Sequence, residues 1–195
     1  IVPHAIVGHS LGEAAAAVAS GALGVSDGLR VVVYRSQLMA RVAGLGATAV
    51  IGASRAVVEP IAADAGASIA GANSPETTVV AGSPDAVERA IEMAAERQLF
   101  ARRVAGSDIA FHSPQMDPLA VELTAQLAGL APAPTSVTLV SSVTGAPIDG
   151  GTLDGHYWAR NLRAPFRFDA AMAWLLDEGV TSFLEVSPHP VLGSA

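Results

Sequence analysis

The feature that most constrains this chain is a serine between two glycines, at the junction of an apolar run and an alanine-rich run. Ala5–Val7 has the composition of a short buried strand, the pattern Gly8-x-Ser10-x-Gly12 follows it, and residues 13–20 have strong helix propensity. A serine at the top of a sharp strand-to-helix turn exposes its hydroxyl, and side chains at the two flanking positions would clash. The free N–H groups of the helix then face the charge that develops on an oxyanion. The pattern predicts Ser10 as a nucleophile; the alternative is that the glycines only let a helix pack closely on a sheet.

The hydrophobic pattern predicts an α/β fold in which a small unit interrupts a larger one. Residues 47–111 have the order strand, helix, two strands, helix, strand, which is the ferredoxin-like arrangement. We therefore expect an α/β-hydrolase-like large subdomain, formed by residues 1–46 and 112–195, and a ferredoxin-like small subdomain at 47–111. The expected strands are 5–7, 48–52, 101–111, 137–143 and 183–186, with two more on either side of residues 73–76. The expected helices are 13–20, 56–65, 84–98, 113–127, 157–162 and 168–178, with another that begins after the capping residues Ser26-Asp27 and ends at Gly44.

Composition excludes several classes of function. The formal net charge is −7, so the chain offers no basic patch for a nucleic-acid backbone. It has no cysteine, which rules out disulfides, thiolate metal sites and cysteine nucleophiles, and it has no lysine, which rules out Schiff-base chemistry. No apolar run reaches the length of a membrane span, and the first residues do not resemble a signal peptide. We expect a cytoplasmic protein that binds neither nucleic acid nor membrane.

A serine nucleophile needs a base, and the histidines are the candidates. His112 ends a predicted strand directly before Ser113-Pro114, where a side chain at the junction of two units can project into a cleft. A histidine at a strand end is more often a structural hydrogen-bonding residue, so position alone leaves the base unassigned. No two histidines have a metal-binding spacing such as H-E-x-x-H, so no metal site is expected. The histidines of the chain are His4, His9, His112, His156 and His189.

Several short motifs, in order along the whole chain, resemble the signatures of the malonyl-CoA:acyl carrier protein transacylase family. The chain is similar in particular to the acyltransferase domains of modular polyketide synthases and type I fatty acid synthases. Each motif is weak alone, but together and in this order they are specific. The motifs are Gly8-His9-Ser10-Leu11-Gly12-Glu13, Tyr34-Arg35-Ser36-Gln37-Leu38-Met39, Ala110-Phe111-His112-Ser113, Tyr157-Trp158-Ala159-Arg160-Asn161-Leu162 and Leu184-Glu185-Val186-Ser187-Pro188.

The resemblance implies a role for each of several positions. Ser10 is acylated, and His112 is its general base and afterwards the acid that protonates the departing thiol. Arg35 holds the free carboxylate of the acyl group, which suits a planar guanidinium that stays charged; without the resemblance, Arg35 would be interpreted as one more solvated helix arginine. The Leu11 N–H supplies one half of the oxyanion hole. Asn161 orients the His112 ring, through its backbone carbonyl, in place of the aspartate of a triad.

The resemblance also implies a choice of acyl group. In similar domains, an aliphatic residue after the serine and a phenylalanine before the histidine accompany malonyl, whereas glutamine and serine accompany methylmalonyl. Leu11 and Phe111 meet the malonyl pattern, and Ile109 departs from it because histidine is common there. A bulky ring near the acyl α-carbon crowds out an α-methyl group, an effect of about 1–3 kcal/mol. Malonyl is therefore expected in preference to methylmalonyl.

The function implied is acyl transfer from coenzyme A, through a serine ester, to the phosphopantetheine thiol of an acyl carrier protein in polyketide or fatty acid synthesis. No permanently bound cofactor is implied, because the coenzyme A thioester is a substrate and phosphopantetheine belongs to the carrier protein. The partners implied are that carrier protein and neighbouring synthase domains. Family members have a Gly-Gln-Gly-type segment before the nucleophile strand that supplies the other half of the oxyanion hole, and these residues lack it. We therefore expect a fragment of a larger polypeptide and leave open whether it is active alone.

Two other functions remain open at this point. A serine hydrolase or thioesterase of the α/β-hydrolase type has the chain order serine, acid, histidine, which Ser10, Asp177 and His189 satisfy. The predicted ferredoxin-like unit and Arg35 speak against it. The other function is that of a non-catalytic, truncated domain that serves as a docking surface between neighbouring modules.

Two substitutions separate the acyltransferase from the hydrolase. If His112 is the base, His112→Ala slows acylation of Ser10 by about 10²–10⁴-fold, the usual contribution of a general base, and His189→Ala does not slow it. The reverse pattern would support the hydrolase. The measurement is the rate at which the acyl adduct appears in mass spectra of the intact protein, with Ser10→Ala as the blank.

Overall fold

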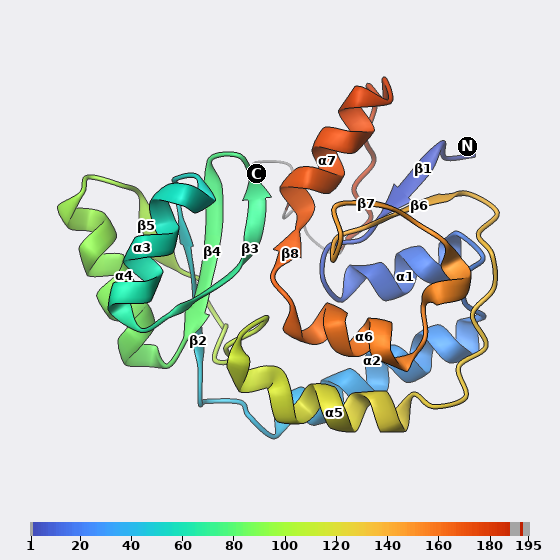
Figure 1. Cartoon of the computed structure of the whole chain (residues 1–195), viewed down its shortest axis with the longest axis horizontal. Coiled ribbons are helices and arrows are strands. Elements are labelled where there is room, and N and C mark those ends of the chain that lie inside the picture. Colours follow the sequence, from blue (N-terminus) through green and yellow to red (C-terminus); the bar gives the residue numbers. More distant parts are fainter. Residues whose placement is uncertain (1, 188–191, 193–195) are drawn as a thin grey trace.

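The computed structural model describes residues 2–187 and 192, which form two β-sheets and the helices that cover them (Figure 1). The strands are β1 Ala5–Val7, β2 Ala47–Ile51, β3 Ser68–Ser74, β4 Thr77–Gly82, β5 Ala101–Arg103, β6 Thr138–Ser141, β7 Ala146–Ile148 and β8 Phe166–Arg167. The helices are α1 Gly12–Ala19, α2 Val25–Ala40, α3 Arg55–Ala65, α4 Pro84–Glu96, α5 Asp117–Gln126, α6 Gly155–Arg163 and α7 Phe168–Asp177, with short 3₁₀ helices η1 Pro114–Met116 and η2 Gly150–Thr152. In the part of the chain that the structure describes, no helix has both the length and the apolar character needed to cross a membrane.

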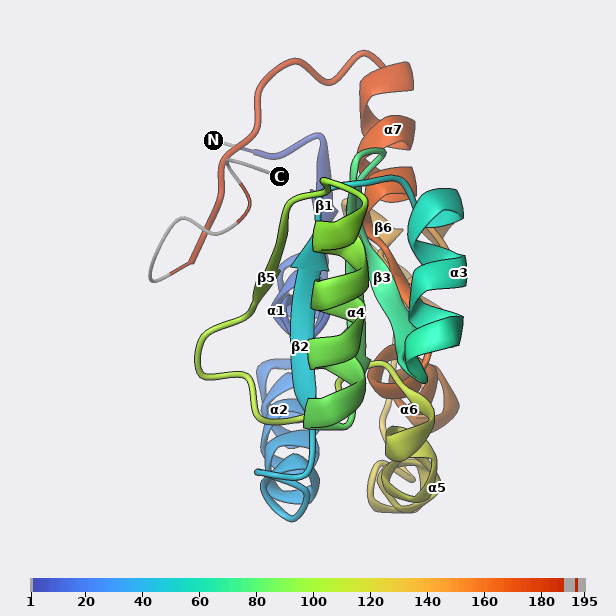
Figure 2. The same ribbon diagram turned by 90° about the vertical axis from the view of Figure 1, so that its left-hand side faces the viewer.

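The larger sheet has the strand order β5-β2-β4-β3-β8. The strands from β2 to β5 pair antiparallel in the ferredoxin-like order, and α3 and α4 pack side by side over one face (Figure 2). Apolar residues of these helices and strands, among them Ile51, Ile61, Val80 and Val87, form a core that solvent does not reach. The inserted unit therefore has a hydrophobic core of its own.

A further strand joins this sheet from a distant part of the sequence. β8 pairs in parallel with β3, where Gly71 lies opposite Phe166. Glycine is needed here because a Cβ on residue 71 would lie 2.4 Å from Cγ of Phe166. The sheet of the inserted unit thus includes β8, which lies outside the range 47–111. The boundaries of the expected subdomains, 1–46, 47–111 and 112–195, stay a prediction.

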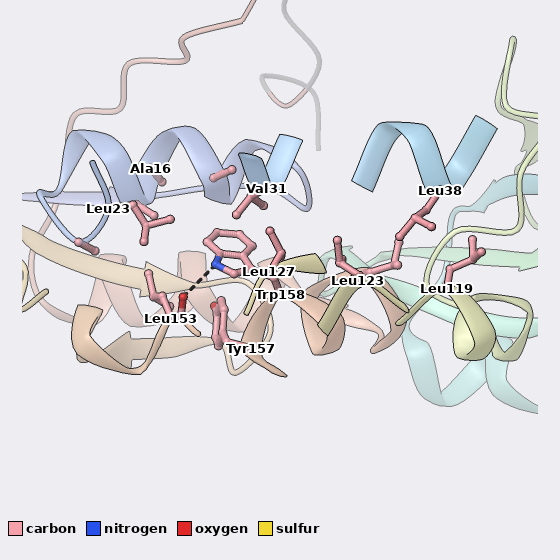
Figure 3. Packing of buried hydrophobic residues seen from close by; sticks show 14 of the residues in the cluster. Ala16, Leu23, Val31, Leu38, Leu119, Leu123, Leu127, Leu153, Tyr157 and Trp158 are labelled. Carbon is pink, nitrogen blue, oxygen red and sulfur yellow. Dashed lines mark hydrogen bonds between the residues drawn. The ribbon is translucent and has the colours of Figure 1, made fainter. Parts of the chain in front are cut away.

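The second sheet and the helices around it form the larger part of the structure. β1 and β6 pair in parallel, and β7 pairs antiparallel with β6. α1, α2, α5 and α6 pack around Trp158, whose indole N–H donates to the Leu153 carbonyl at 3.0 Å (Figure 3). α1 and α2 approach each other closely at Gly28, where a Cβ would lie 2.3 Å from Cγ2 of Val18. This core fixes the start of α1 against α2 and α6.

The α/β fold class expected from the sequence is confirmed. Most predicted elements are present, with ends shifted by a few residues. α2 begins at Val25 with Gly24 as its N-cap, so Ser26-Asp27 lie inside the first turn and do not cap the helix. β6 is shorter than the expected strand 137–143, and the sequence pattern does not indicate β7 or β8.

The strand expected at 101–111 is wrong in its extent. It ends at Arg103, and the chain then turns at Gly106, whose φ is 71°. The Asp108 carbonyl accepts the N–H of Gly46 at 3.0 Å, a contact outside any strand ladder. A conformation with positive φ does not fit a continuous strand, so the sheet pairing stops before it.

The strand expected at 183–186 is wrong. This segment has no regular secondary structure, and Leu184 and Val186 are 82% and 90% exposed. Its apolar pattern is typical of a strand, but within the described residues no neighbouring strand pairs with it. An isolated extended segment has no ladder of hydrogen bonds to stabilise it.

Candidate active site

Ser10 lies in the turn between β1 and α1, as the sequence pattern predicts. Its φ is 53°, a left-handed conformation that is unfavourable for a residue other than glycine. Gly8 makes this turn possible, because a Cβ there would lie 2.2 Å from Cα of Glu13. Gly12 is different: a Cβ there would meet nothing within 4 Å, so the clash expected at both flanking positions is wrong for Gly12.

His112 lies next to Ser10, although the two residues are 102 positions apart in the sequence. Ser10 Oγ and His112 Nε2 are 2.7 Å apart, and the other ring nitrogen, Nδ1, donates to the Ala164 carbonyl at 2.9 Å. The bond to Ala164 sets the tautomer, because a proton on Nδ1 leaves Nε2 as the acceptor for the serine hydroxyl. The imidazole is thus arranged as a general base requires.

The contact predicted between Asn161 and the imidazole is wrong. The carbonyl that orients His112 belongs to Ala164, the C-cap of α6. The physical reason is that carbonyls at the end of a helix have no intrahelical partner and are free to accept from a side chain. Asn161 instead directs its side chain to Arg35 and Glu13.

Burial and a neighbouring cation keep His112 neutral. The imidazole is 3% exposed, and its pKa is lowered from 6.5 to about 3, mainly by burial and then by the positive charge of Arg35. The bond to Ala164 acts in the opposite direction. Because only a neutral imidazole accepts a proton, His112 is in its base form at neutral pH.

Arg35, in α2, is 2% exposed and directs its guanidinium to the nucleophile. Nη2 donates to Ser10 Oγ at 3.0 Å, and Nη1 donates to Asn161 Oδ1 at 2.5 Å. Burial lowers the pKa of Arg35 to about 10, and the negative charge of Glu13 opposes this shift, so the group is charged at neutral pH. The interpretation as a solvated helix arginine is wrong, and a buried cation beside a serine is suited to bind an anion.

The other predicted residues differ in where they lie. Leu11 is half-buried at the N-cap of α1, where the first N–H groups of a helix lack intrahelical partners; its oxyanion role stays a prediction. Phe111 is half-buried and packs against the core of the larger part. His189, the base in the hydrolase alternative, lies outside the described residues, and Asp177 is exposed at the end of α7.

A buried carboxylate that was not predicted from the sequence lies beside the site. Glu13 is 0% exposed and accepts hydrogen bonds from the Tyr157 hydroxyl, from Ser142 at 2.8 Å and from Asn161 Nδ2 at 2.8 Å. Burial raises the pKa of Glu13, whereas these hydrogen bonds lower it. The available signal was its place as a charged residue in an alanine-rich helix, directly after the nucleophile turn.

A second missed contact joins the nucleophile turn to the inserted sheet. His9 Nε2 donates to Asn73 Oδ1 of β3 at 2.9 Å. Its ring packs on Phe166 and Phe168, with centroids 4.6 and 5.1 Å away, and burial lowers its pKa. Both parts of the structure therefore hold the turn that presents the nucleophile.

The fold and the site together define an α/β domain in which a serine at a strand-to-helix turn is paired with a buried, neutral histidine, the arrangement of nucleophilic acyl transfer. A sequence profile of the family described as "Acyl transferase domain" matches residues 1–195. The chain belongs to this family. Its membership favours an acyltransferase over both a serine hydrolase and a non-catalytic docking domain.

Proteins similar to this chain include polyketide synthases and their acyltransferase domains. The chain is 42% identical over 195 residues to a mycocerosic acid synthase-like polyketide synthase of Mycolicibacterium smegmatis, covering 98% of this chain and 9% of that protein. The acyltransferase domain from module 8 of the salinomycin polyketide synthase has a TM-score of 0.95 at 37% identity, covering 100% of this chain and 46% of that one. The acyltransferase domain of the polyketide synthase PpsC of Mycobacterium tuberculosis has a TM-score of 0.92 at 36% identity, covering 100% and 60%. The chain thus spans a small part of the length of the synthase that it matches.

The lowered pKa of His112 predicts how the acylation rate depends on pH. A base with a pKa of about 3 stays unprotonated where an ordinary histidine, with a pKa of 6.5, gains a proton. Acylation of Ser10 by p-nitrophenyl acetate, an uncharged ester, should therefore keep its rate from about pH 8 down to about pH 5. The measurement is the burst of p-nitrophenol, corrected with Ser10→Ala. A rate that halves near pH 6.5 would contradict the prediction.

Proposed function

We propose that this domain transfers a malonyl group from coenzyme A, through an ester on Ser10, to the phosphopantetheine thiol of an acyl carrier protein. The observation that carries the proposal is the distance of 3.0 Å between Nη2 of Arg35, a buried cation, and Ser10 Oγ. In a malonyl ester, one methylene separates the carboxylate from the carbonyl attached to Oγ, so a cation beside Oγ also reaches that carboxylate. The guanidinium donates to two neutral groups, Asn161 Oδ1 and Ser10 Oγ, so the carboxylate of the substrate supplies a direct ionic partner for the buried charge.

His112 moves the proton in both halves of the reaction. In the first half, Ser10 Oγ attacks the thioester carbonyl and its proton passes to Nε2 of His112. The carbon–sulfur bond then breaks, and the imidazolium returns the proton to the departing coenzyme A sulfur. In the second half, the phosphopantetheine thiol gives its proton to Nε2 and attacks the ester, and the proton returns to Oγ as the ester bond breaks.

The start of α1 supports the charge that develops on the carbonyl oxygen. In each half of the reaction this oxygen becomes negative, and the Leu11 N–H lies directly after the nucleophile at the helix N-cap. The positive end of the helix dipole acts in the same direction. The guanidinium of Arg35 adds a positive charge 3.0 Å from Oγ.

Two side chains support malonyl in preference to methylmalonyl. Phe111 directly precedes His112 and Leu11 directly follows Ser10 in the sequence, and Ser10 Oγ lies 2.7 Å from His112 Nε2, so we expect both side chains near the ester that forms on Ser10. A ring near the acyl α-carbon leaves less room for a methyl branch, and one methyl group changes specificity by about 10- to 200-fold. The preference for malonyl over methylmalonyl is therefore expected to be measurable, but not larger than the effect of one methyl group.

The partners follow from the same proposal. The donor and the acceptor both carry the acyl group on a phosphopantetheine arm, so one entrance to Ser10 serves both. The chain is similar to one portion of polyketide synthases, such as that of Mycolicibacterium smegmatis. By that likeness we infer an acyl carrier protein and neighbouring synthase domains as partners.

Removal of the guanidinium is expected to change substrate choice more than the acyl transfer itself. Arg35→Ala should lower kcat/KM for loading from malonyl-CoA by about two to three orders of magnitude, because it removes one partner of a buried charge pair. Loading from acetyl-CoA, which has no carboxylate, should fall much less. Mass spectrometry of the intact protein measures both reactions, with Ser10→Ala as the blank. An equal loss with the two esters would count against the proposal.

Substitution of the aromatic ring tests the choice between the two extender groups. In a mixture of equal amounts of malonyl-CoA and methylmalonyl-CoA, the wild type should carry mainly malonyl on Ser10. Phe111→Ser should raise the share of methylmalonyl by about tenfold or more. Phe100→Ser, at a phenylalanine that is 62% exposed, is the matched control and should leave the share unchanged. The same share in Phe111→Ser and wild type would show that this ring does not select the acyl group.

A further inference from the structure

We propose that Glu13 is a positioning residue that holds the guanidinium of Arg35 at the nucleophile through the side-chain amide of Asn161. The inference rests on the proposed function, in which that guanidinium binds the carboxylate of the acyl group. According to this inference, selection of a carboxylated substrate depends on a buried relay of three side chains, Glu13 of α1, Asn161 of α6 and Arg35 of α2, and not on the arginine alone.

Every hydrogen bond described for the Glu13 carboxylate is donated to it. The Tyr157 hydroxyl donates to Oε1, and the Ser142 hydroxyl and the Asn161 amide donate to Oε2, each at 2.8 Å. An ionised carboxylate only accepts hydrogen bonds, so an environment of donors suits the charged form. The structure therefore surrounds Glu13 as an anion, in a place that solvent does not reach.

The carboxylate determines which way the Asn161 amide faces. Nδ2 donates to Glu13 Oε2 at 2.8 Å and to the Ser10 carbonyl at 3.3 Å, which leaves Oδ1 to accept from Nη1 of Arg35 at 2.5 Å. A flipped amide would place its NH₂ against the guanidinium, donor against donor, and its oxygen against the carboxylate, acceptor against acceptor. One orientation of Asn161 satisfies both neighbours, and Glu13 selects it.

Arg35 depends on this relay because it has few other partners. Among the described residues, its guanidinium donates to Asn161 and to Ser10 Oγ, and its Nε is buried without a partner. The bond to Oγ does not serve as a permanent support, since Oγ becomes an ester oxygen during the reaction. The negative charge of Glu13 also opposes the lowering of the pKa of Arg35 by burial. Glu13 thus supports both the position and the charge of the guanidinium.

The test is Glu13→Gln, which keeps the length of the side chain, removes its charge and places an NH₂ group among donors. The ratio of kcat/KM for malonyl-CoA to kcat/KM for acetyl-CoA should fall by about ten- to a hundredfold, the usual effect of losing a residue that orients a binding group. The change should lie mainly in the KM for malonyl-CoA. Glu88→Gln makes the same charge change at an exposed position of α4 and should leave the ratio unchanged.

A double substitution separates this inference from the proposed function. If Glu13 acts through Arg35, Glu13→Gln causes no further fall of the ratio in a protein that already carries Arg35→Ala. A further fall would overturn the inference, and so would an unchanged ratio in Glu13→Gln alone. Failure of the proposed function has a different signature: the wild type then shows no preference for malonyl-CoA over acetyl-CoA, and Arg35→Ala leaves the ratio as it was.

Asn161→Ala provides the test if Glu13→Gln does not fold, which circular dichroism and thermal unfolding reveal. This variant leaves Glu13 bonded to Tyr157 and Ser142. It removes the amide that links Glu13 to Arg35, together with the weaker bond of that amide to the Ser10 carbonyl at 3.3 Å. The same fall of the ratio supports the relay. An unchanged ratio in a folded Asn161→Ala protein overturns it.

Discussion

A positive charge buried beside the nucleophile is the constraint on which the rest of the site depends. Removing a guanidinium from water costs roughly several kcal/mol unless the charge is paired and its N–H groups are bonded. Arg35 meets this condition only in part: Nη1 donates to the Asn161 amide, which is bonded to the Glu13 carboxylate, while Nε has no partner among the described residues. The packing of the three helices around Trp158 keeps these groups in reach of one another. The same charge helps to keep His112 neutral. One buried cation is thus suited to bind an anion and also helps to keep the imidazole of His112 neutral.

Ser10 and His112, the proposed nucleophile and base, share an unusual backbone conformation. Ser10 and His112 have φ values of 53° and 55°, and a left-handed conformation costs a residue other than glycine about 1–3 kcal/mol. Bonds within the turn hold Ser10 in place, where Gly12 N–H donates to the His9 carbonyl at 2.9 Å and Glu13 N–H donates to the Ser10 carbonyl at 3.1 Å. The strained conformation directs both side chains to one point, because a strand or helix conformation would project each of them elsewhere.

The sequence pattern predicted features that depend on residues close together in the chain. It did not predict contacts between residues far apart in the chain. The nucleophile turn follows from Gly8 and Ser10, and the ferredoxin-like order follows from the alternation of apolar runs and turn residues. The carbonyl that orients the base could not be predicted, because Ala164 faces His112 only when α6 has packed against the rest of the structure. The segment 183–186 is an example of a wrong prediction with the same cause. Its alternation of residues is typical of a strand, but a strand forms only where another strand pairs with it.

The fit between Gly71 and Phe166 makes the inserted sheet part of the machinery that sets the base. Phe166 follows closely after Ala164, and its ring lies against the imidazole of His112, with centroids 5.3 Å apart. A side chain at position 71 would displace this ring and, with it, the carbonyl that decides where the histidine carries its proton. The range 47–111 therefore cannot be exchanged between related domains without regard to position 71. A segment grafted from a relative has to have a glycine at this position. Otherwise the Ala164 carbonyl moves away from Nδ1 of His112, and the ring is no longer held in the tautomer whose Nε2 accepts from Ser10.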